Sequence, residues 1–214
     1  MSSTTILLIR HGETAWNRGH IFRGLSDIPL NEQGRTQARL LAQALLSRQI
    51  DAAYSSPLSR AMETASIAFA LRGLTVAAHD GLRDFDYGRW TGLEECEVAR
   101  QWPDEDAQWR VAPHEMRPPE GETLREAFHR AWEALAALTA RHQGQTVAIV
   151  AHRVINKVLV SGLLTLGLER CPFIRQDNCC LNEFERAERG DIVISLNDTS
   201  HLRQSRTECL TSDF

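Results

Sequence analysis

The sequence lacks the features of a membrane-spanning, secreted or nucleic-acid-binding protein. No run reaches the roughly 18 apolar residues that a membrane-spanning helix needs. The first residues hold no basic segment followed by a long apolar one, so we expect no signal peptide. The 24 Lys and Arg residues stand against 28 Asp and Glu, a formal net charge of −4, and both signs are mixed along the chain. This balance argues against broad electrostatic binding to nucleic acid or to anionic lipid.

The five cysteines are few, odd in number and without the CxxC or Cys/His spacing of a zinc site. Cys179 and Cys180 are adjacent, which suits neither an ordinary disulfide nor a metal site. We interpret the cysteines as reduced packing residues, because disulfides are rare in the cytosol. Because we also expect no signal peptide, we expect a cytoplasmic protein. Because its charge is mixed, we expect a few local cations to hold any anion that it binds.

The 214 residues suffice for one large domain with a sizeable core. Apolar residues make up 43% of the chain and charged residues 24%, close to the average for globular proteins. No internal repeat or low-complexity segment divides it. We predict a single domain over residues 1–214, with an excursion at about 79–120 that crosses the strand tips and covers the site.

Strand-like and helix-like segments alternate along the chain. The predicted strands are 4–9, 52–56, 74–78, 146–152, 180–185 and 191–196. The predicted helices are 31–48 with Asn31 as N-cap, 57–71 with Pro57 at its first position, 122–142 and 153–166, with short helices near 92–101 and 104–110. Such alternation indicates βαβ units. We predict an α/β protein, a three-layer sandwich whose mostly parallel central sheet is flanked by helices.

Cations and imidazoles follow the predicted strands at their carboxyl ends. Arg10 and His11 follow the first strand, and Arg60 lies one turn into the helix after the second. His152 and Arg153 follow the strand that begins near residue 146. Ligands of open α/β sheets bind outside the carboxyl ends of the strands, and the planar fork of arginine matches two phosphate oxygens. The sequence therefore predicts an oxyanion site for a phosphate group.

Five blocks of sequence occur in a characteristic order: RHGETAWN at 10–17, SSPLSRAMETA at 55–65, LRDFDYGRWTG at 82–92, PPEGETL at 118–124 and VAHR at 150–153. Together they resemble the histidine phosphatase superfamily, which includes cofactor-dependent phosphoglycerate mutases, fructose-2,6-bisphosphatases and α-ribazole phosphatases. The pattern is closest to the α-ribazole and broad-specificity phosphatases, and the resemblance covers nearly the whole chain. It implies the phosphoglycerate mutase-like fold.

The resemblance also implies an activity and the residues that perform it. The activity is that of a metal-independent phosphomonoesterase, which hydrolyses a small phosphorylated metabolite through a phosphohistidine and needs no cofactor. His11 resembles the nucleophile that attacks phosphorus. Arg10, Arg60 and His152 resemble the phosphate pocket, which opposes the charge that develops on the transferring group.

The predicted proton donor departs from the family pattern. The family usually carries a Glu where this chain has Asp84. Asp is one methylene shorter, so the backbone must come closer or the proton must pass through a water. Its unperturbed pKa, about 3.9 against 4.3 for Glu, also makes it depend more on burial to hold a proton. Asp86 in the same segment is the alternative donor.

Four further residues are expected to bind the substrate. Asn17 and Gly24 match polar substrate-side positions of the family. Arg23 stands where such loops often carry Ser or Gln, and Arg153 replaces a common Gly after the second histidine. Arg23 and Arg153 are therefore candidates to hold a second anionic group, either a carboxylate or another phosphate.

Two alternatives stay open beside hydrolysis. A phosphoglycerate mutase-type transfer is one, although the mutases of this superfamily carry a longer basic insert, and residues 92–120 hold only three arginines among many acids. A phosphate-binding module without turnover is the other, favoured by Asp84 and disfavoured by the two histidines. The expected partner is a small phosphorylated substrate, not nucleic acid or membrane, and the protein is expected to be a monomer or a homodimer.

Overall fold

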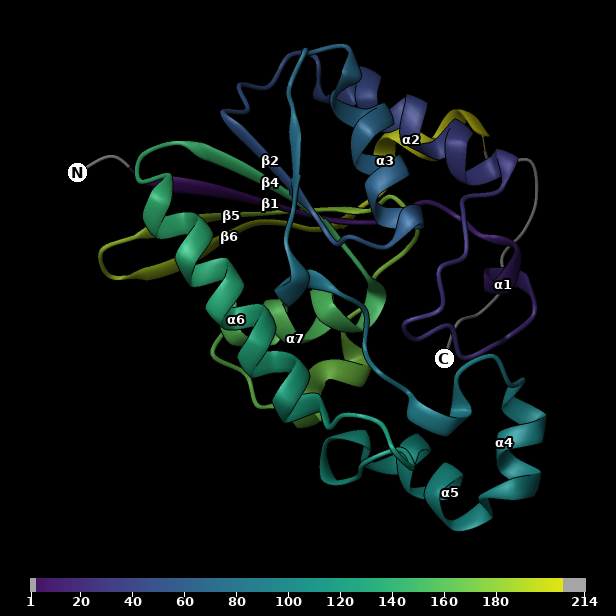
Figure 1. The fold of residues 1–214 in the computed structure, drawn as a ribbon. Helices are drawn as coiled ribbons and strands as arrows, with labels where there is room; N and C mark the ends of the chain where they lie inside the picture. Colours follow the sequence, from purple (N-terminus) through teal and green to yellow (C-terminus); the bar gives the residue numbers. More distant parts are fainter. Residues whose placement is uncertain (1–2, 206–214) are drawn as a thin grey trace.

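The computed structural model describes residues 3–205, in which a central sheet lies between two layers of helices (Figure 1). The strands are β1 (Thr4–Arg10), β2 (Ala52–Ser55), β3 (Val76–Ala78), β4 (Thr146–Ala151), β5 (Leu181–Ala187) and β6 (Gly190–Asp198). The α-helices are α1 (Ala15–Arg18), α2 (Glu32–Leu45), α3 (Ser59–Ala70), α4 (Glu95–Gln101), α5 (Pro103–Val111), α6 (Leu124–Arg141) and α7 (Arg153–Leu163). Short 3₁₀ helices are η1 (Asp80–Leu82), η2 (Gly88–Trp90), η3 (Pro113–Glu115), η4 (Leu168–Phe173) and η5 (Ser200–Ser205).

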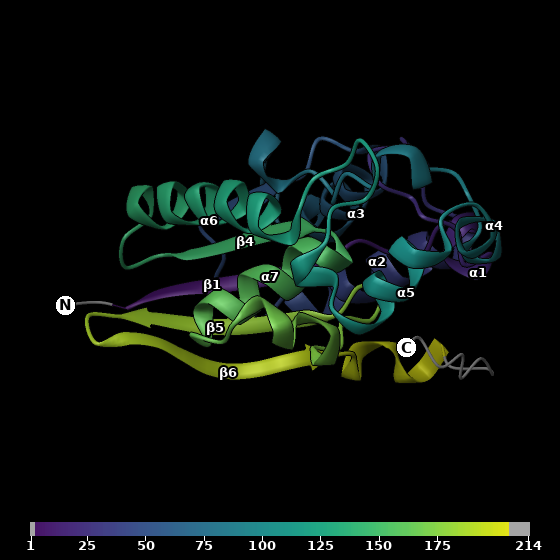
Figure 2. The ribbon, with the colours of Figure 1, turned by 90° about the horizontal axis from the view of Figure 1, so that it is seen from below.

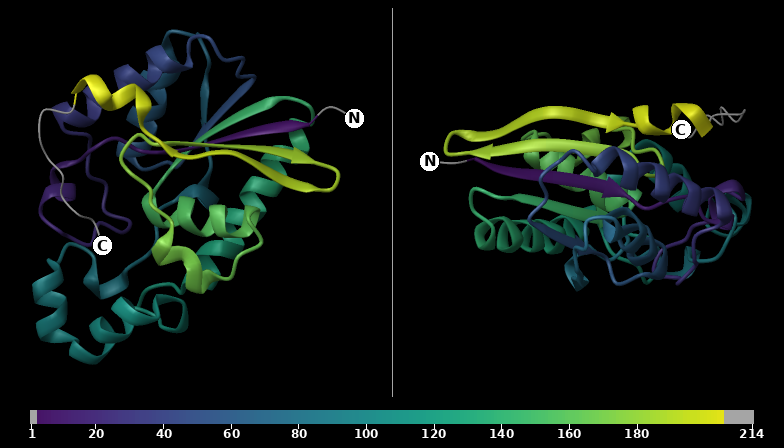
Figure 3. Two further views of the ribbon diagram at one scale, coloured as in Figure 1. Left: turned by 180° about the vertical axis from the view of Figure 1, so that it is seen from behind. Right: turned by 90° about the horizontal axis from the view of Figure 1, so that it is seen from above.

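The sheet has the strand order β3-β2-β4-β1-β5-β6. β1 pairs with β4, and β2 with β3 and β4, all in parallel, whereas β5 and β6 are antiparallel additions at one side. Figure 2 and Figure 3 show β6 along the free edge. The predicted α/β fold with a mostly parallel sheet is therefore confirmed.

β1 is buried on both faces, which explains its uninterrupted apolar run. Ile6 and Leu8 belong to the core formed with α6 and α7, while Leu7 and Ile9 belong to the core formed with α2 and α3. All four are 0% exposed, and each such burial contributes roughly 1.5–3 kcal/mol. Because both faces are filled up to residue 9, the chain first meets the rim of the sheet at Arg10, the last residue of β1.

The segment 79–120 packs on the core of α6 and α7 and lies beyond the carboxyl ends of the strands, with α4 and α5 at its far side (Figure 1). Aromatic rings pack within this segment and join it to the loop after α1, with centroids 4.8–5.9 Å apart. These rings belong to Phe22, Phe85, Tyr87, Trp90 and Trp109. The packing fixes the part of the chain that carries the predicted acid beside the strand tips.

Several predicted boundaries differ from the structure. Asn31 caps α2 as predicted, because its side chain accepts a hydrogen bond from the Gly34 N–H. The prediction that Pro57 begins the next helix is wrong: α3 begins at Ser59, because Leu58 is extended and donates its N–H to the Ser56 hydroxyl. The four-residue helix α1 was not predicted, since it is too short to show a period.

Candidate active site

His11 lies directly beyond β1, at the tip of the sheet. Gly12 follows it, and a Cβ at this position would come within 2.6 Å of the Gly34 carbonyl oxygen, so the loop packs tightly on α2. The His11 Nδ1 atom lies 2.7 Å from the Gly12 carbonyl oxygen. A carbonyl only accepts hydrogen bonds, so Nδ1 carries the ring proton and Nε2 keeps its lone pair. His11 is therefore held in the tautomer that can attack through Nε2.

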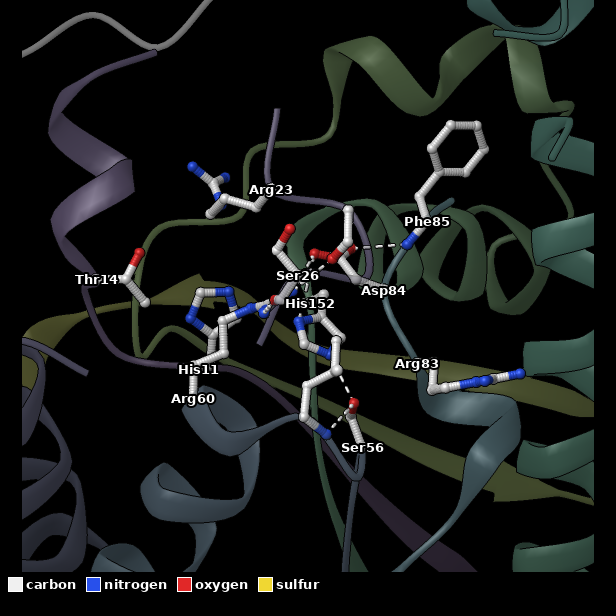
Figure 4. A network of polar contacts seen from close by, with 12 residues as sticks. His11, Thr14, Arg23, Ser26, Ser56, Arg60, Arg83, Asp84, Phe85 and His152 are labelled. Atoms are coloured by element: carbon white, nitrogen blue, oxygen red, sulfur yellow. Dashed lines mark hydrogen bonds and ion pairs between the residues drawn. The ribbon is translucent and has the colours of Figure 1, made fainter. Parts of the chain in front are cut away.

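His152 follows β4, the strand beside β1. The register that pairs Arg10 with Ala151 sets the two histidines side by side, with ring centroids 5.2 Å apart (Figure 4). His152 Nε2 lies 2.7 Å from the Ser56 hydroxyl, which already accepts the N–H of Leu58. The Asp84 carboxylate, 3.5 Å from Nδ1, favours the ring proton on that nitrogen, so that Nε2 accepts from the Ser56 hydroxyl. Sequence reasoning missed Ser56, although it lies within the block at 55–65.

Arg60 is fully buried at the start of α3. Its Nη1 donates to the Ser26 carbonyl at 2.7 Å, and its Nη2 donates to the Gly24 carbonyl and to Asp84, both at 2.9 Å. Its Nε has no hydrogen-bond partner among the described residues. Gly24 has φ +49°, and a Cβ there would meet Thr91 Oγ1 at 2.7 Å. The backbone carbonyl of Gly24 thus helps to orient the Arg60 guanidinium.

Asp84 is the predicted acid that reaches the histidines. Its Oδ2 pairs with Arg60 at 2.9 Å and lies 3.5 Å from His152 Nδ1, while its Oδ1 accepts the Phe85 N–H (Figure 4). Asp86 instead turns back on its own segment, where its carboxylate accepts the N–H of Gly88. The short side chain of Asp84 therefore contacts the cluster directly, and no bridging water is needed for that contact.

The positive surroundings act on both imidazoles. Arg10 is held at the rim by a hydrogen bond from its Nη1 to the Gln176 carbonyl at 2.6 Å. Burial, and next the charge of Arg60, lower the pKa of His11 well below 6.5. The same two causes, in the same order, lower the pKa of His152 well below 6.5. Both rings are therefore neutral at neutral pH, the state that a nitrogen nucleophile requires.

A pocket opens next to this cluster and shares Asp84 with it. Asn17, Arg23 and Arg153 line it, as do Tyr87 and Glu95, which sequence reasoning missed. The Asn17 side-chain oxygen accepts from the N–H and hydroxyl of Thr14, which orders α1. Burial, followed by the charge of Arg153, lowers the pKa of Arg23 to about 10, so that Arg23 stays charged at neutral pH.

The predicted site residues thus fall into two groups. His11, Arg10, Arg60, His152 and Asp84 meet at the strand tips, and Asn17, Arg23 and Arg153 line the adjoining pocket. Gly24 touches Arg60 and does not line the pocket. The catalytic and binding roles of all these residues stay predictions.

Three further observations concern metals, membranes and cysteines. Within residues 3–205, no group of three or more His, Cys, Asp and Glu side chains is arranged to hold a metal ion. No helix in this part of the chain has the length and apolarity to cross a bilayer. Cys96, Cys171, Cys179 and Cys180 are free thiols, and Cys209 lies outside the described residues.

Two arginines lie beside two neutral imidazoles at the strand tips of an α/β sheet. This arrangement is typical of phosphoryl-transfer enzymes that use a histidine. The chain belongs to the histidine phosphatase superfamily (branch 1), whose family model matches residues 6–199. Phosphoserine phosphatase 1 of Hydrogenobacter thermophilus is 33% identical over 203 residues, which cover 95% of this chain and 96% of that protein. YhfR of Bacillus stearothermophilus superposes with a TM-score of 0.89 at 32% identity, covering 93% of this chain and 99% of YhfR.

A mutase is also among the relatives. The probable phosphoglycerate mutase GpmB of Yersinia pestis (strain Pestoides F) is 34% identical over 206 residues, covering 92% of this chain and 94% of that protein. The weight of the relatives and of the site lies with hydrolysis. The chain is a phosphatase of the histidine phosphatase superfamily.

Proposed function

We propose that this phosphatase is a metal-independent phosphomonoesterase that hydrolyses a small phosphorylated metabolite through a phosphohistidine on His11. One observation carries the proposal: the neutral ring of His11 lies 5.2 Å from that of His152, beside the buried guanidinium of Arg60. Arg60 Nε and His152 Nδ1 lack hydrogen-bond partners among the described residues. Buried donors without acceptors are costly, and phosphate oxygens would satisfy them.

The first half-reaction forms the phosphohistidine. The lone pair of His11 Nε2 attacks phosphorus in line with the ester oxygen, and the ester P–O bond breaks. The carboxylic acid of Asp84 gives its proton to the leaving oxygen. Arg10, Arg60 and His152 stabilise the charge on the oxygens of the transferring group, and act as preorganised donors in a site that excludes water.

The second half-reaction restores the enzyme. A water replaces the departed alcohol and attacks phosphorus from the same side, while the Asp84 carboxylate takes up its proton. The N–P bond then breaks, and its electron pair returns to His11 Nε2 as inorganic phosphate leaves. One acid thus serves as donor and then as base, so its closeness to both histidines serves both steps.

The side-chain cations fill the place of a metal in this proposal. Arginine presents fixed donors and remains charged at any physiological pH, so Arg10 and Arg60 can neutralise the phosphoryl oxygens without Mg²⁺, while neutral His152 adds a hydrogen-bond donor. We also propose that the enzyme works in the cytoplasm. The free thiols of the described cysteines support this location, because such thiols persist in a reducing compartment.

A single assay tests the proposed function. The protein is incubated with p-nitrophenyl phosphate in excess EDTA, and released phosphate is measured beside acid-labile protein phosphorylation after rapid quenching. We expect turnover in EDTA and a phosphorylated protein that the His11→Asn variant does not form. Turnover that needs added metal, or a variant that keeps full activity, would contradict the mechanism.

The mutase reading is the second candidate, and the GpmB relative favours it. Incubation with 3-phosphoglycerate and a catalytic amount of 2,3-bisphosphoglycerate separates the two activities. We expect loss of 3-phosphoglycerate to be matched by inorganic phosphate. Formation of 2-phosphoglycerate without free phosphate would favour the mutase, and neither product from any phosphoester would favour a binding module.

A further inference from the structure

Two arginines of the pocket beside the phosphate site lack an acidic partner. Arg23 and Arg153 both line it, and neither forms an ion pair with a carboxylate among the described residues. Arg23 donates only a long hydrogen bond of 3.3 Å, to the Trp16 carbonyl, and its buried Nε has no partner in the described chain. Arg153 lines the pocket beside the buried Tyr87, and its positive charge opposes the rise that burial causes in the pKa of Tyr87.

Both cations sit where the protein itself disfavours positive charge. Arg153 is the first residue of α7, at the end of the helix where the aligned peptide dipoles repel cations. Burial, and next the charge of Arg153, lower the pKa of Arg23, and the opposite effects of Asp84 and Tyr87 are smaller. The phosphate site holds its own arginines, Arg10 and Arg60, so this second pair is not required for the transferring group. The arrangement therefore favours a further anion bound between them.

The charge of the pocket indicates which anion fits. Glu95 lines the same pocket as the two arginines, and Asp84, which is paired with Arg60, lies where the pocket meets the phosphate site. A second phosphate, with nearly two negative charges, would be repelled by Glu95 and by the phosphate at the strand tips about twice as strongly as a group of single charge. A carboxylate has a single charge and two oxygens, which match the fork of one guanidinium.

We propose that Arg23 and Arg153 bind a carboxylate of the substrate, so that the natural substrate is the phosphomonoester of a small hydroxy acid. This inference rests on the proposed function, because it assigns the phosphate to the cluster at the strand tips and the carboxylate to the adjoining pocket. Asp84 lies at the boundary between the two, where the bridging ester oxygen receives its proton.

Matched pairs of phosphoesters test the inference. O-Phosphoserine has a carboxylate where O-phosphoethanolamine has a hydrogen, and 3-phosphoglycerate has a carboxylate where glycerol 3-phosphate has a hydroxymethyl group. For the parent enzyme we expect kcat/KM at least about 10-fold higher for the carboxylated member of each pair, the effect of one charge-assisted hydrogen bond. Arg23→Met and Arg153→Met should each lower kcat/KM about 10- to 100-fold for the carboxylated ester, and no more than about threefold for the ester without a carboxylate. Arg125→Met, an exposed arginine on α6, is the matched control and should change neither.

The outcomes separate this inference from the proposed function. Equal kcat/KM for both members of each pair, or equal losses in the arginine variants, would overturn the carboxylate site while leaving the phosphatase mechanism in place. Absence of phosphate release from every ester, with no phosphohistidine, would overturn the proposed function as well. Selective loss on the carboxylated members alone supports the assignment.

Independently of the pocket, Arg130 of α6 holds the segment that carries Asp84. Its guanidinium uses all five of its N–H donors: three go to the carbonyls of Gly81, Arg83 and Asp84 at 2.8–3.0 Å, and two to Glu122. Glu122 in turn accepts the backbone N–H of Asp86. The backbone on both sides of the acid is thus fixed by one ion pair.

We infer that Arg130 is a positioning residue, which keeps the short Asp84 side chain within reach of the leaving oxygen. A misplaced donor affects esters of basic alcohols more than esters of p-nitrophenol, because p-nitrophenolate leaves without full protonation. We therefore expect Arg130→Met to lower kcat/KM about 10- to 100-fold for an alkyl phosphate and only a few-fold for p-nitrophenyl phosphate.

Two variants control for a purely structural effect. Arg83→Met removes a side chain that points away from the cluster and should leave both rates unchanged (Figure 4). Arg130→Lys keeps the charge without the fork and should show the same dependence on the leaving group, with folding monitored by circular dichroism. Equal losses on both esters in a folded Arg130 variant would overturn the positioning role, and selective loss on the alkyl ester supports it.

Discussion

The phosphate cluster and the adjoining pocket are built in different ways. The cluster draws four of its five residues from the ends of β1 and β4 and the start of α3, and none of these four, Arg10, His11, Arg60 and His152, is more than 1% exposed. The pocket draws Arg23, Tyr87 and Glu95 from loops and a helix end, and its two arginines are half-buried. We therefore expect the sheet to fix the chemistry, and segments that can vary without disturbing the sheet to set the choice of alcohol.

The largest effect should come from the centre of the cluster. His11→Asn removes the nucleophile, and we expect kcat to fall on the order of 10⁴-fold for every substrate, whatever its leaving group. Phosphate release with p-nitrophenyl phosphate and with O-phosphoserine measures it. A loss confined to one of the two esters would show that His11 selects the substrate rather than attacks phosphorus, and would contradict the division of roles between cluster and pocket.

Asp84 stands between the two regions, and its removal should depend on the substrate. Asp84→Asn is expected to lower kcat/KM about 10²- to 10³-fold for alkyl phosphates and far less for p-nitrophenyl phosphate. Asp86→Asn provides the comparison and should remain within about threefold of the parent, because its carboxylate serves only a turn. The reverse order of the two variants would reassign the proton donor.

A smaller effect is expected from the hydroxyl behind His152. Ser56→Ala removes the hydrogen bond that places the proton on Nδ1, and kcat/KM should fall about 10-fold for all esters. Ser59→Ala is the matched control, since the Ser59 hydroxyl is buried without a partner among the described residues. A Ser56→Ala enzyme with parental rates would show that the ring of His152 is oriented by other contacts.

The smallest effect concerns pH and stability. The folded-state pKa of His11 lies well below 6.5, so the unfolded chain binds more protons than the folded chain as the pH drops through 6.5. The free energy of unfolding should therefore decrease toward pH 5.5, and the decrease should be smaller in His11→Asn by about 1 kcal/mol. Urea unfolding at pH 7.5 and 5.5 measures it. An equal decrease in both proteins would show that His11 is solvated in the fold.

The phosphate cluster could be read from the sequence because each of its residues follows a recognisable local element. A buried strand must end where its neighbours end, so apolar runs that stop at Arg10 and at His152 placed both near one point. The sequence predicts that the proton donor is Asp84 or Asp86. In the structure the Asp86 carboxylate accepts a hydrogen bond within its own turn, which favours Asp84.

Other parts were not readable from local patterns. Ser56 meets His152 across 96 positions of sequence, and Arg130 meets Asp84 across 46, so neither contact leaves a periodic signal. The start of α3 was misplaced for the same reason, since the Ser56 hydroxyl that holds Leu58 extended is itself positioned by β4 and His152. Gly24 differs from these residues, because the sequence predicts it as a site residue but not its contact: its carbonyl accepts a hydrogen bond from Arg60.

The aromatic rings that hold the segment 79–120 give the protein an optical signal. Tyr87, which lines the pocket with Arg153, packs edge-on against Trp109, which lies edge-on to Trp90. An anion bound at Arg153 should therefore change the electric field at both indoles. Intrinsic tryptophan emission of the unlabelled enzyme should then report occupancy of the adjoining pocket more strongly than occupancy of the cluster at the strand tips.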